Sequence, residues 1–109
     1  MDINKLFNID GKTALITGGS RGIGEMIAAG FLANGVKVYI TARKEAPLLE
    51  KAKELSEKFS GECIAIPCDL SNMEGIKKLA FDYLDHEESF DILVNNAGAA
   101  WGAPDEDFS

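Results

Sequence analysis

The sequence is poor in the residues that bind metal ions and form disulfides. It contains two cysteines and one histidine among 109 residues. If Cys63 and Cys68 share one extended strand, their α-carbons lie on the order of 16 Å apart, well beyond the roughly 7 Å that a disulfide allows. His86 stands among acidic residues and has no partner at the spacing of a zinc site. We therefore expect two reduced packing cysteines, a surface histidine and no metal site.

Long apolar runs are also missing, although 46% of the residues are hydrophobic. The uninterrupted apolar stretches are too short to cross a bilayer, and Met1–Lys5 lacks the basic patch and apolar stretch of a secretory signal. A chain of 109 residues has the length of one domain. We expect one cytoplasmic domain over residues 1–109, with a core of its own and no membrane partner.

Basic residues are outnumbered, with 11 Lys and Arg against 18 Asp and Glu and a net charge of −7. The imbalance is uneven, because residues 1–60 hold nine basic and seven acidic side chains, whereas residues 61–109 hold two and eleven. A strong negative charge disfavours nucleic acid. The slightly positive first half fits a small phosphorylated ligand better, and the second half is most simply a solvated acidic surface.

Four apolar runs rich in β-branched residues recur along the chain, and each suits a buried strand. They are Thr13–Thr17, Val36–Thr41, Cys63–Pro67 and Asp91–Asn95. Three apolar stripes at helical spacing lie between them: Ile23, Ile27 and Phe31; Leu48, Ala52, Leu55 and Phe59; Ile76, Ala80 and Tyr83. Strands that alternate with helices form a parallel sheet, because right-handed crossovers place each helix against a face of that sheet. The sequence therefore predicts the α/β class.

Local signals mark the ends of two of the expected helices. Asn34-Gly35 is typical of a helix end. Ser71-Asn72-Met73-Glu74 has the spacing of a capping box, in which a hydroxyl accepts from a free amide of the first turn and a glutamate reaches back. We expect Ser71 to be the N-cap of the third helix.

Glycines are concentrated in Thr17-Gly18-Gly19-Ser20-Arg21-Gly22-Ile23-Gly24, between the first strand and the first helix. In a parallel sheet this turn lies at the edge where ligands bind, and the helix offers unpaired amides and a partial positive charge. Gly18 would permit the tight turn, Gly22 would let a pyrophosphate approach the amides, and Gly24 would let the helix pack closely on the sheet. The alternative is an ordinary tight turn that uses glycine without any ligand.

Cations follow the second strand, where a dinucleotide's adenine ribose is recognised. A free 2′-hydroxyl is usually held there by a carboxylate, whereas a 2′-phosphate needs a cation. The chain offers Arg43 at this point, with Arg21 as a second arm and no carboxylate over residues 41–44. NADP is therefore favoured over NAD. The alternative is a pair of solvated arginines.

Two further stretches follow the third and fourth strands: Asp69-Leu70 and Asn95-Asn96-Ala97-Gly98. With them the sequence resembles the short-chain dehydrogenase/reductase family, which pairs a Thr-Gly-x-x-x-Gly-x-Gly loop with an Asn-Asn-Ala-Gly motif at about this separation. The resemblance covers the chain from Lys12 onward. It implies a Rossmann-type doubly wound parallel sheet, of which this chain holds the first four strands in the order 3-2-1-4.

The resemblance also implies a set of residues that bind NADP(H). They are Gly18, Gly19, Ser20, Arg21, Gly22, Ile23, Gly24, Arg43, Asp69, Leu70, Asn96, Ala97 and Gly98. By this resemblance the loop from Gly18 to Ile23 cradles the pyrophosphate, with Ser20 and Arg21 on the adenosine phosphate side, and Arg43 selects the phosphorylated cofactor.

The remaining positions would hold the adenosine. Asp69 would accept a hydrogen bond from the adenine amino group, and the Leu70 amide would donate nearby. Asn96 and Ala97 would pass close to the adenine-side ribose, and Gly98 would line the floor of the site. Simpler readings stay open, because the side chain of Leu70 also suits the core and Asn95 also suits a tie between strands.

Family members transfer a hydride between the nicotinamide and a carbonyl or alcohol, using a tyrosine with a lysine four residues later and a serine. No residue here matches that catalytic set, since Arg43 follows Tyr39 by four and Glu87 follows Tyr83 by four. The chain ends eleven residues after Gly98. We therefore expect the cofactor-binding part of an NADP(H)-dependent oxidoreductase, incomplete and inactive alone. A non-catalytic NADP-binding module and a pure interaction protein are the alternatives.

The partners expected from this interpretation are a small carbonyl or alcohol substrate for the complete enzyme and further copies of the chain. The apolar residues Ile92-Leu93-Val94 would form a free sheet edge, and such edges favour association. The identity of the substrate and the direction of the reaction stay open.

Overall fold

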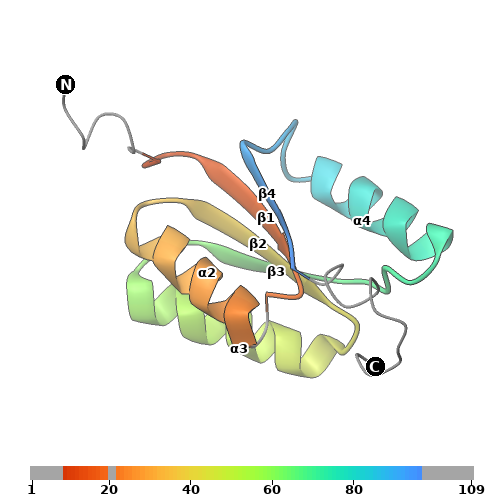
Figure 1. The fold of residues 1–109 in the computed structure, drawn as a ribbon, viewed down its shortest axis with the longest axis horizontal. Helices are drawn as coiled ribbons and strands as arrows, with labels where there is room; N and C mark the ends of the chain where they lie inside the picture. The colour runs from red at the N-terminus through yellow and green to blue at the C-terminus, as the bar shows by residue number, and fades with distance from the viewer. Residues whose placement is uncertain (1–8, 20–21, 97–109) are drawn as a thin grey trace.

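The computed structural model describes residues 9–19 and 22–96. Within them a four-stranded, wholly parallel sheet has the order β3-β2-β1-β4 (Figure 1). The elements in chain order are β1 (Thr13–Thr17), α2 (Gly22–Ala33), β2 (Lys37–Ala42), α3 (Glu45–Phe59), β3 (Cys63–Pro67), α4 (Met73–Leu84) and β4 (Ile92–Asn95). The expected fold class and strand order are confirmed. β1 and β3 have the expected bounds, whereas β2 lies one residue later than expected and β4 begins one residue later.

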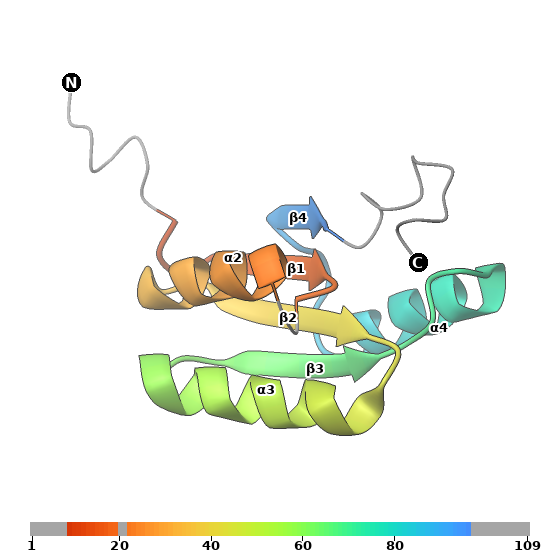
Figure 2. The same ribbon diagram turned by 60° about the horizontal axis from the view of Figure 1, so that its bottom comes forward.

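The register aligns the strand ends at one edge. Thr17 at the end of β1 pairs with Thr41 of β2 and with Asn95 of β4. Figure 2 shows the arrowheads of all four strands pointing toward this same edge. The last residues of each strand, and the loops that follow them, are therefore neighbours although up to 78 positions separate them in the sequence.

We call the side of the sheet that α2 and α3 cover the first face (Figure 2). Alternate residues of β1 and β2 point into it, because successive side chains of a strand face opposite ways. Its buried core is aliphatic and contains Ala14, Ile16, Ala28, Leu32, Val36, Val38, Ile40, Leu48, Ala52, Leu55 and Cys63. The serine Ser56 joins α3 to β3, since its hydroxyl accepts from the Cys63 amide at 3.0 Å.

The opposite side, covered by α4, is the second face. Its core is smaller and consists of Leu15, Tyr39, Ile66, Cys68, Leu79 and Tyr83. The rings of Tyr39 and Tyr83 meet edge to face, with centroids 4.8 Å apart. Cys63 and Cys68 are buried on opposite faces as free thiols, as expected for packing residues. In the described part of the chain, no helix is both long enough and apolar enough to span a membrane.

The predicted helix faces are correct for α3 and partly correct for α2 and α4, where Ile27 and Phe31 pack against the core and Tyr83 is buried as expected. In α3, Leu48, Ala52 and Leu55 are buried as expected, and Phe59 packs against the core. The residues that α2 and α4 bury are Gly24, Ala28 and Leu32, and Gly75, Leu79 and Tyr83. Ile23 is instead 67% exposed and Ile76 is 45% exposed. In both helices the buried row begins at a glycine, which an apolar pattern does not detect.

The predicted cap of α4 is wrong by one residue. Asn72 is the N-cap, and its side-chain oxygen accepts from the Gly75 amide at 2.8 Å. Ser71 turns away from the helix, and its amide and hydroxyl both donate to Oδ1 of Asp69. Asparagine and serine are similarly good N-caps. Because Ser71 is hydrogen-bonded to the Asp69 carboxylate, the side chain of Asn72 is the one that caps α4.

Candidate functional site

The strand ends are joined by hydrogen bonds at what we call the glycine edge, the edge formed by Gly18, Thr41, Cys68 and Asn96. The Gly18 amide donates to the Thr41 carbonyl at 2.9 Å, and the Cys68 amide donates to Ala42 at 2.9 Å. From the other side, Nδ2 of Asn96 donates to the Gly18 carbonyl at 3.2 Å. The loop after β1 is therefore fixed on both flanks.

Backbone conformation explains two of the glycines in this loop. Gly18 has φ +72° and Gly22 has φ +64°, values that other residues rarely adopt. A Cβ atom at Gly22 would meet none of the described residues within 4 Å. The described residues thus leave space beside the first turn of α2, and a helix begins there with amides that have no partner within the helix. Such a terminus favours an anion.

Close packing explains the glycines at positions 19 and 24. A Cβ atom on Gly19 would overlap the Ile40 side chain. A Cβ on Gly24 would overlap the Gly18 carbonyl and would lie 2.9 Å from Nδ2 of Asn96. Gly24 therefore lets the start of α2 sit directly on the loop that Asn96 holds, which agrees with the packing role expected for it.

Charge at this edge comes from Arg43 and Asp69. Arg43 follows β2, its side chain is exposed, and it forms no ion pair with any residue of 9–19 and 22–96. Asp69 follows β3 and accepts from the Ser71 amide at 2.9 Å and from the Ser71 hydroxyl at 2.6 Å, both at Oδ1. These hydrogen bonds, together with the nearby Arg43 charge, hold the pKa of the Asp69 carboxyl below its usual range. A carboxylate and an uncommitted guanidinium thus stand on adjacent strand ends.

Asn95 and Ile23 lie beside the same loop. The Thr17 hydroxyl donates to Oδ1 of Asn95 at 3.1 Å, so Asn95 does tie β4 to β1. Ile23 does not contribute to the core as its helical spacing suggested, and its side chain is exposed at the first turn of α2. Leu70 is half-buried and packs against the core of the second face, which supports a packing role for its side chain. Its backbone amide has no hydrogen-bond partner among the described residues.

The fold brings nine of the predicted site residues to one edge of the sheet: Gly18, Gly19, Gly22, Ile23, Gly24, Arg43, Asp69, Leu70 and Asn96. Four others, Ser20, Arg21, Ala97 and Gly98, lie outside the described residues. Sequence reasoning missed two polar contributors. Thr41 is 1% exposed, and its hydroxyl lies 3.4 Å from the Gly18 amide. Ser71 was predicted to cap α4, but it binds the Asp69 carboxylate. The only sequence signal for this contact is the aspartate two residues before the serine.

Neither tyrosine lies at the glycine edge. Tyr39 donates its hydroxyl to Oε2 of Glu87 at 2.7 Å, and Tyr83 donates to the Ser89 carbonyl at 2.8 Å, both in the core of the second face or beside it. Burial raises the pKa of both hydroxyls, that of Tyr83 to about 12. Buried hydroxyls with such partners cannot act as proton donors to a ligand at the glycine edge.

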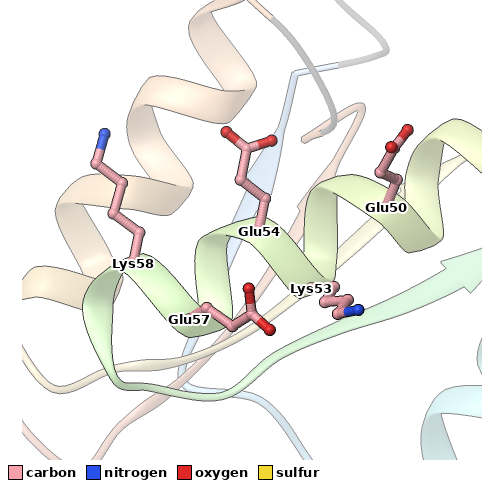
Figure 3. A pocket seen from close by; sticks show the side chains of 5 residues that line it. All are labelled: Glu50, Lys53, Glu54, Glu57 and Lys58. Carbon is pink, nitrogen blue, oxygen red and sulfur yellow. The ribbon is translucent and has the colours of Figure 1, made fainter.

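A shallow depression on the outer surface of α3 is a weaker candidate. Figure 3 shows its lining, which comes from a single helix and consists of Glu50, Lys53, Glu54, Glu57 and Lys58. All five are exposed and carry charges of both signs, and Glu54 is already paired with Lys51 at 3.1 Å. A row of exposed charges from one helix keeps a protein hydrated and provides no enclosed surface for a ligand. The glycine edge remains the candidate site.

Known proteins share this fold. The family model for short chain dehydrogenase matches residues 12–109. A 3-oxoacyl-[acyl-carrier-protein] reductase of rhamnolipid biosynthesis from Pseudomonas aeruginosa is 47% identical over 102 residues, which are 94% of this chain and 39% of that protein. The structure of the Pseudomonas aeruginosa RhlG/NADP active-site complex superposes with a TM-score of 0.78 at 43% identity, over 88% of this chain and 40% of that one.

A second solved structure is L-sorbose reductase from Gluconobacter frateurii complexed with NADPH and L-sorbose. Its TM-score is 0.79 at 40% identity, over 84% of this chain and 35% of that one. The chain thus spans about one-third to two-fifths of the length of these relatives. The family model covers nearly the whole sequence, and the structural matches agree with it. The chain belongs to the short chain dehydrogenase family.

Proposed function

We propose that this chain is the NADP(H)-binding part of a short-chain oxidoreductase that reduces carbonyls or oxidises alcohols by hydride transfer. The observation that carries the proposal is the glycine edge, where the start of α2, a carboxylate and a guanidinium that has no ion pair among the described residues lie at the ends of adjacent strands. Two relatives with this fold are, by their descriptions, complexes with NADP or NADPH.

The pyrophosphate would lie against the loop from Gly18 to Ile23. The open space at Gly22 and the free amides at the start of α2 support this position, because backbone amides and the helix dipole together stabilise negative charge. Ser20 and Arg21 of the same loop would reach the phosphate on the adenosine side. Gly24 contributes by keeping the helix close to the loop.

The adenosine would follow the ends of the neighbouring strands. Asp69 would accept from the adenine amino group, and the Leu70 amide, which has no partner in the described part of the chain, would donate to the ring. Asn96 and Ala97 would line the ribose, with Gly98 below it. Asn96 is suited to this role because its amide is already held by the Gly18 carbonyl.

Arg43 would bind the 2′-phosphate and so select NADP(H). It is exposed and without an ion pair among the described residues, so no internal bond has to be broken. A charge-assisted hydrogen bond of this kind contributes roughly 1.5 to 3 kcal/mol, which favours the phosphorylated cofactor by one to two orders of magnitude.

The proposed activity belongs to the complete enzyme. In this chain Tyr39 and Tyr83 are committed to Glu87 and Ser89, and neither has a lysine four residues later. We infer that the 109-residue chain binds the cofactor without transferring hydride. Its two buried free thiols suit the reducing cytoplasm.

Calorimetric titration with NADPH and NADH tests the proposal. We expect the chain to bind NADPH about tenfold or more tightly than NADH, and Arg43→Ala to remove most of that preference. Lys44→Ala is the matched control, because it removes the same charge from the adjacent exposed residue and should retain the preference. Absence of binding to either nucleotide by the folded chain would refute the function, and an unchanged preference in Arg43→Ala would refute the role of Arg43 alone.

A further inference from the structure

We propose that Ser71 is a positioning residue that holds the Asp69 carboxylate away from Arg43, so that Asp69 reads the adenine base while Arg43 stays available for the 2′-phosphate. The inference rests on the proposed function and deepens it, since it names what sets the base selectivity of the same site. Ser71 would thereby affect the binding of both the adenine base and the 2′-phosphate.

The contacts of Asp69 are one-sided. Its Oδ1 accepts twice from the same residue, from the Ser71 amide at 2.9 Å and from the Ser71 hydroxyl at 2.6 Å. Its Oδ2 has no partner among the described residues. Two donors on one oxygen fix the plane of the carboxylate and leave the other oxygen as the acceptor for a ligand.

The backbone of Asp69 is held as well. The Asp69 carbonyl lies so close to Gly75, in the first turn of α4, that a Cβ atom there would overlap it. Gly75 is in turn fixed by its amide, which donates to the Asn72 side chain at 2.8 Å. Main chain and side chain of Asp69 are therefore both anchored at the start of α4.

Arg43 is the competing partner for this carboxylate. It follows Ala42, whose carbonyl accepts from the Cys68 amide beside Asp69 at 2.9 Å, so the two charged side chains stand on adjacent strand ends, yet no ion pair within 4.0 Å joins them. Both side chains are needed for different parts of the cofactor, and an ion pair between them would consume both. The Ser71 hydroxyl supplies a short charge-assisted bond that opposes such a pair, and bonds of this type are about twice as strong as neutral ones.

The chemistry of the base makes this testable. Adenine presents a 6-amino donor, whereas hypoxanthine presents a carbonyl oxygen at that place and a protonated ring nitrogen beside it. A carboxylate that is fixed against the 6-position accepts from the amino group of adenine and is repelled by the carbonyl oxygen of hypoxanthine, and it cannot move to the ring N–H beside it. A carboxylate that has turned toward Arg43 distinguishes the two bases less well, and it also neutralises the cation that the 2′-phosphate needs.

The experiment is calorimetric titration of the chain and of Ser71→Ala with three cofactors: NADPH, NADH and reduced nicotinamide hypoxanthine dinucleotide phosphate. In Ser71→Ala we expect the preference for NADPH over the hypoxanthine analogue to fall about threefold to tenfold, the range expected when one preorganised side chain is released. The preference for NADPH over NADH should fall in the same variant. Ser71→Thr keeps the hydroxyl and should restore both ratios.

Two controls separate positioning from general damage. Ser89→Ala removes an exposed serine elsewhere and should leave both ratios unchanged. In an Asp69→Asn background, Ser71→Ala should have little further effect on base preference, because the charged group that it positions is gone. Equal ratios in Ser71→Ala and in the unmodified chain would overturn the inference while leaving the proposed function intact. Absence of NADPH binding by the unmodified chain would overturn both.

Discussion

The two faces of the sheet are built by different means. The first face buries an aliphatic core under two helices, with Ile16, Val38 and Ile40 fully inaccessible to solvent. The second face has a single helix among the described residues, and its core depends on two tyrosines and the polar groups that hold them. Large apolar side chains remain exposed on both sides, with Phe81 at 78% and Leu93 at 53% on this one and Met26 at 72% on α2.

The two faces therefore contribute differently to the stability of the fold and to its association with other chains. Buried aliphatic area is the largest favourable contribution to folding, so the first face should supply most of the stability. It also positions the glycine edge, because α2 begins at Gly22 and packs on that face. The second face should be less stable, dependent on pH and available for association. Substitutions on the two faces can test each part of this comparison.

The largest effect is expected in the core of the first face. Ile40→Ala should lower the free energy of unfolding by about 3 to 4 kcal/mol, because it leaves a cavity under a fully buried side chain. Ile64→Ala is the matched substitution on the second face, where the isoleucine is only partly buried, and should cost about 1 to 2 kcal/mol. Urea denaturation followed by circular dichroism measures both. Equal losses would contradict the comparison.

A smaller effect is expected where α2 meets the glycine edge. Gly24→Ala introduces a methyl group that overlaps the Gly18 carbonyl, and we expect a loss of about 1 to 3 kcal/mol together with weaker NADPH binding. Gly30→Ala in the same helix meets nothing within 4 Å. It should stabilise the chain by about 0.5 to 1 kcal/mol, since alanine is the better helix former. Thermal unfolding and calorimetry distinguish steric exclusion at Gly24 from a general effect of alanine in α2.

The sequence alone predicted the strands and order of the sheet, but it did not fully predict the buried faces of α2 and α4. β-Branched runs such as Thr13–Thr17 and Cys63–Pro67 are recognisable because a strand buried on both faces is apolar throughout. The inward rows of α2 and α4 begin at Gly24 and Gly75, where a backbone atom of another segment occupies the place of a side chain. Close approach requires a residue that contributes nothing to apolar periodicity, so the pattern assigned Ile23 and Ile76 to the inward faces although both are exposed.

The candidate site was predictable to a similar degree. Glycine spacing and the residues after each strand indicated the glycine edge, because parallel strands end together. The hydrogen bond of Asn96 to Gly18 and those of Ser71 to Asp69 were not predictable, since each depends on rotamers set by tertiary packing. Motif spacing identifies which residues meet, whereas the polar contacts among them require the structure.

On the second face, Tyr39→Phe should cost about 1 to 2 kcal/mol. The substitution removes a buried hydroxyl that donates to Glu87 at 2.7 Å and changes little of the packing against Tyr83. Tyr83→Phe is the natural companion, because it removes the hydrogen bond to the Ser89 carbonyl at 2.8 Å. Denaturant unfolding at pH 7 measures both. No loss in either variant would mean that the polar groups do not hold this face.

The same network should make stability depend on pH. The ion pair with Lys37, at 2.6 Å, and the Tyr39 hydroxyl hold the pKa of Glu87 below its usual range. The contribution of Glu87 is therefore fully present above the ordinary glutamate pKa of about 4.3 and is lost as the pH falls through the depressed folded value. Glu87→Gln should cost at most about 1 kcal/mol at pH 7, because the pair is partly exposed. The difference from the unmodified chain should shrink in acid, and a difference independent of pH would contradict this assignment.

The smallest effect on stability and the clearest effect on association are expected at β4. Leu93 is half exposed on β4, an edge strand of the described sheet, whereas Leu15, the residue of β1 that pairs with it, is buried. Leu93→Lys should change the free energy of unfolding by no more than about 0.5 kcal/mol and should oppose pairing between edges, since a charge on an edge strand disfavours it. Leu49→Lys on α3, where the leucine is 49% exposed, is the control on the first face. Sedimentation velocity should show self-association of the unmodified chain and of Leu49→Lys, and a shift toward the 11.7 kDa monomer only in Leu93→Lys. A monomeric unmodified chain would show that an exposed apolar edge of this length is tolerated, and would confine the contrast between the faces to their cores.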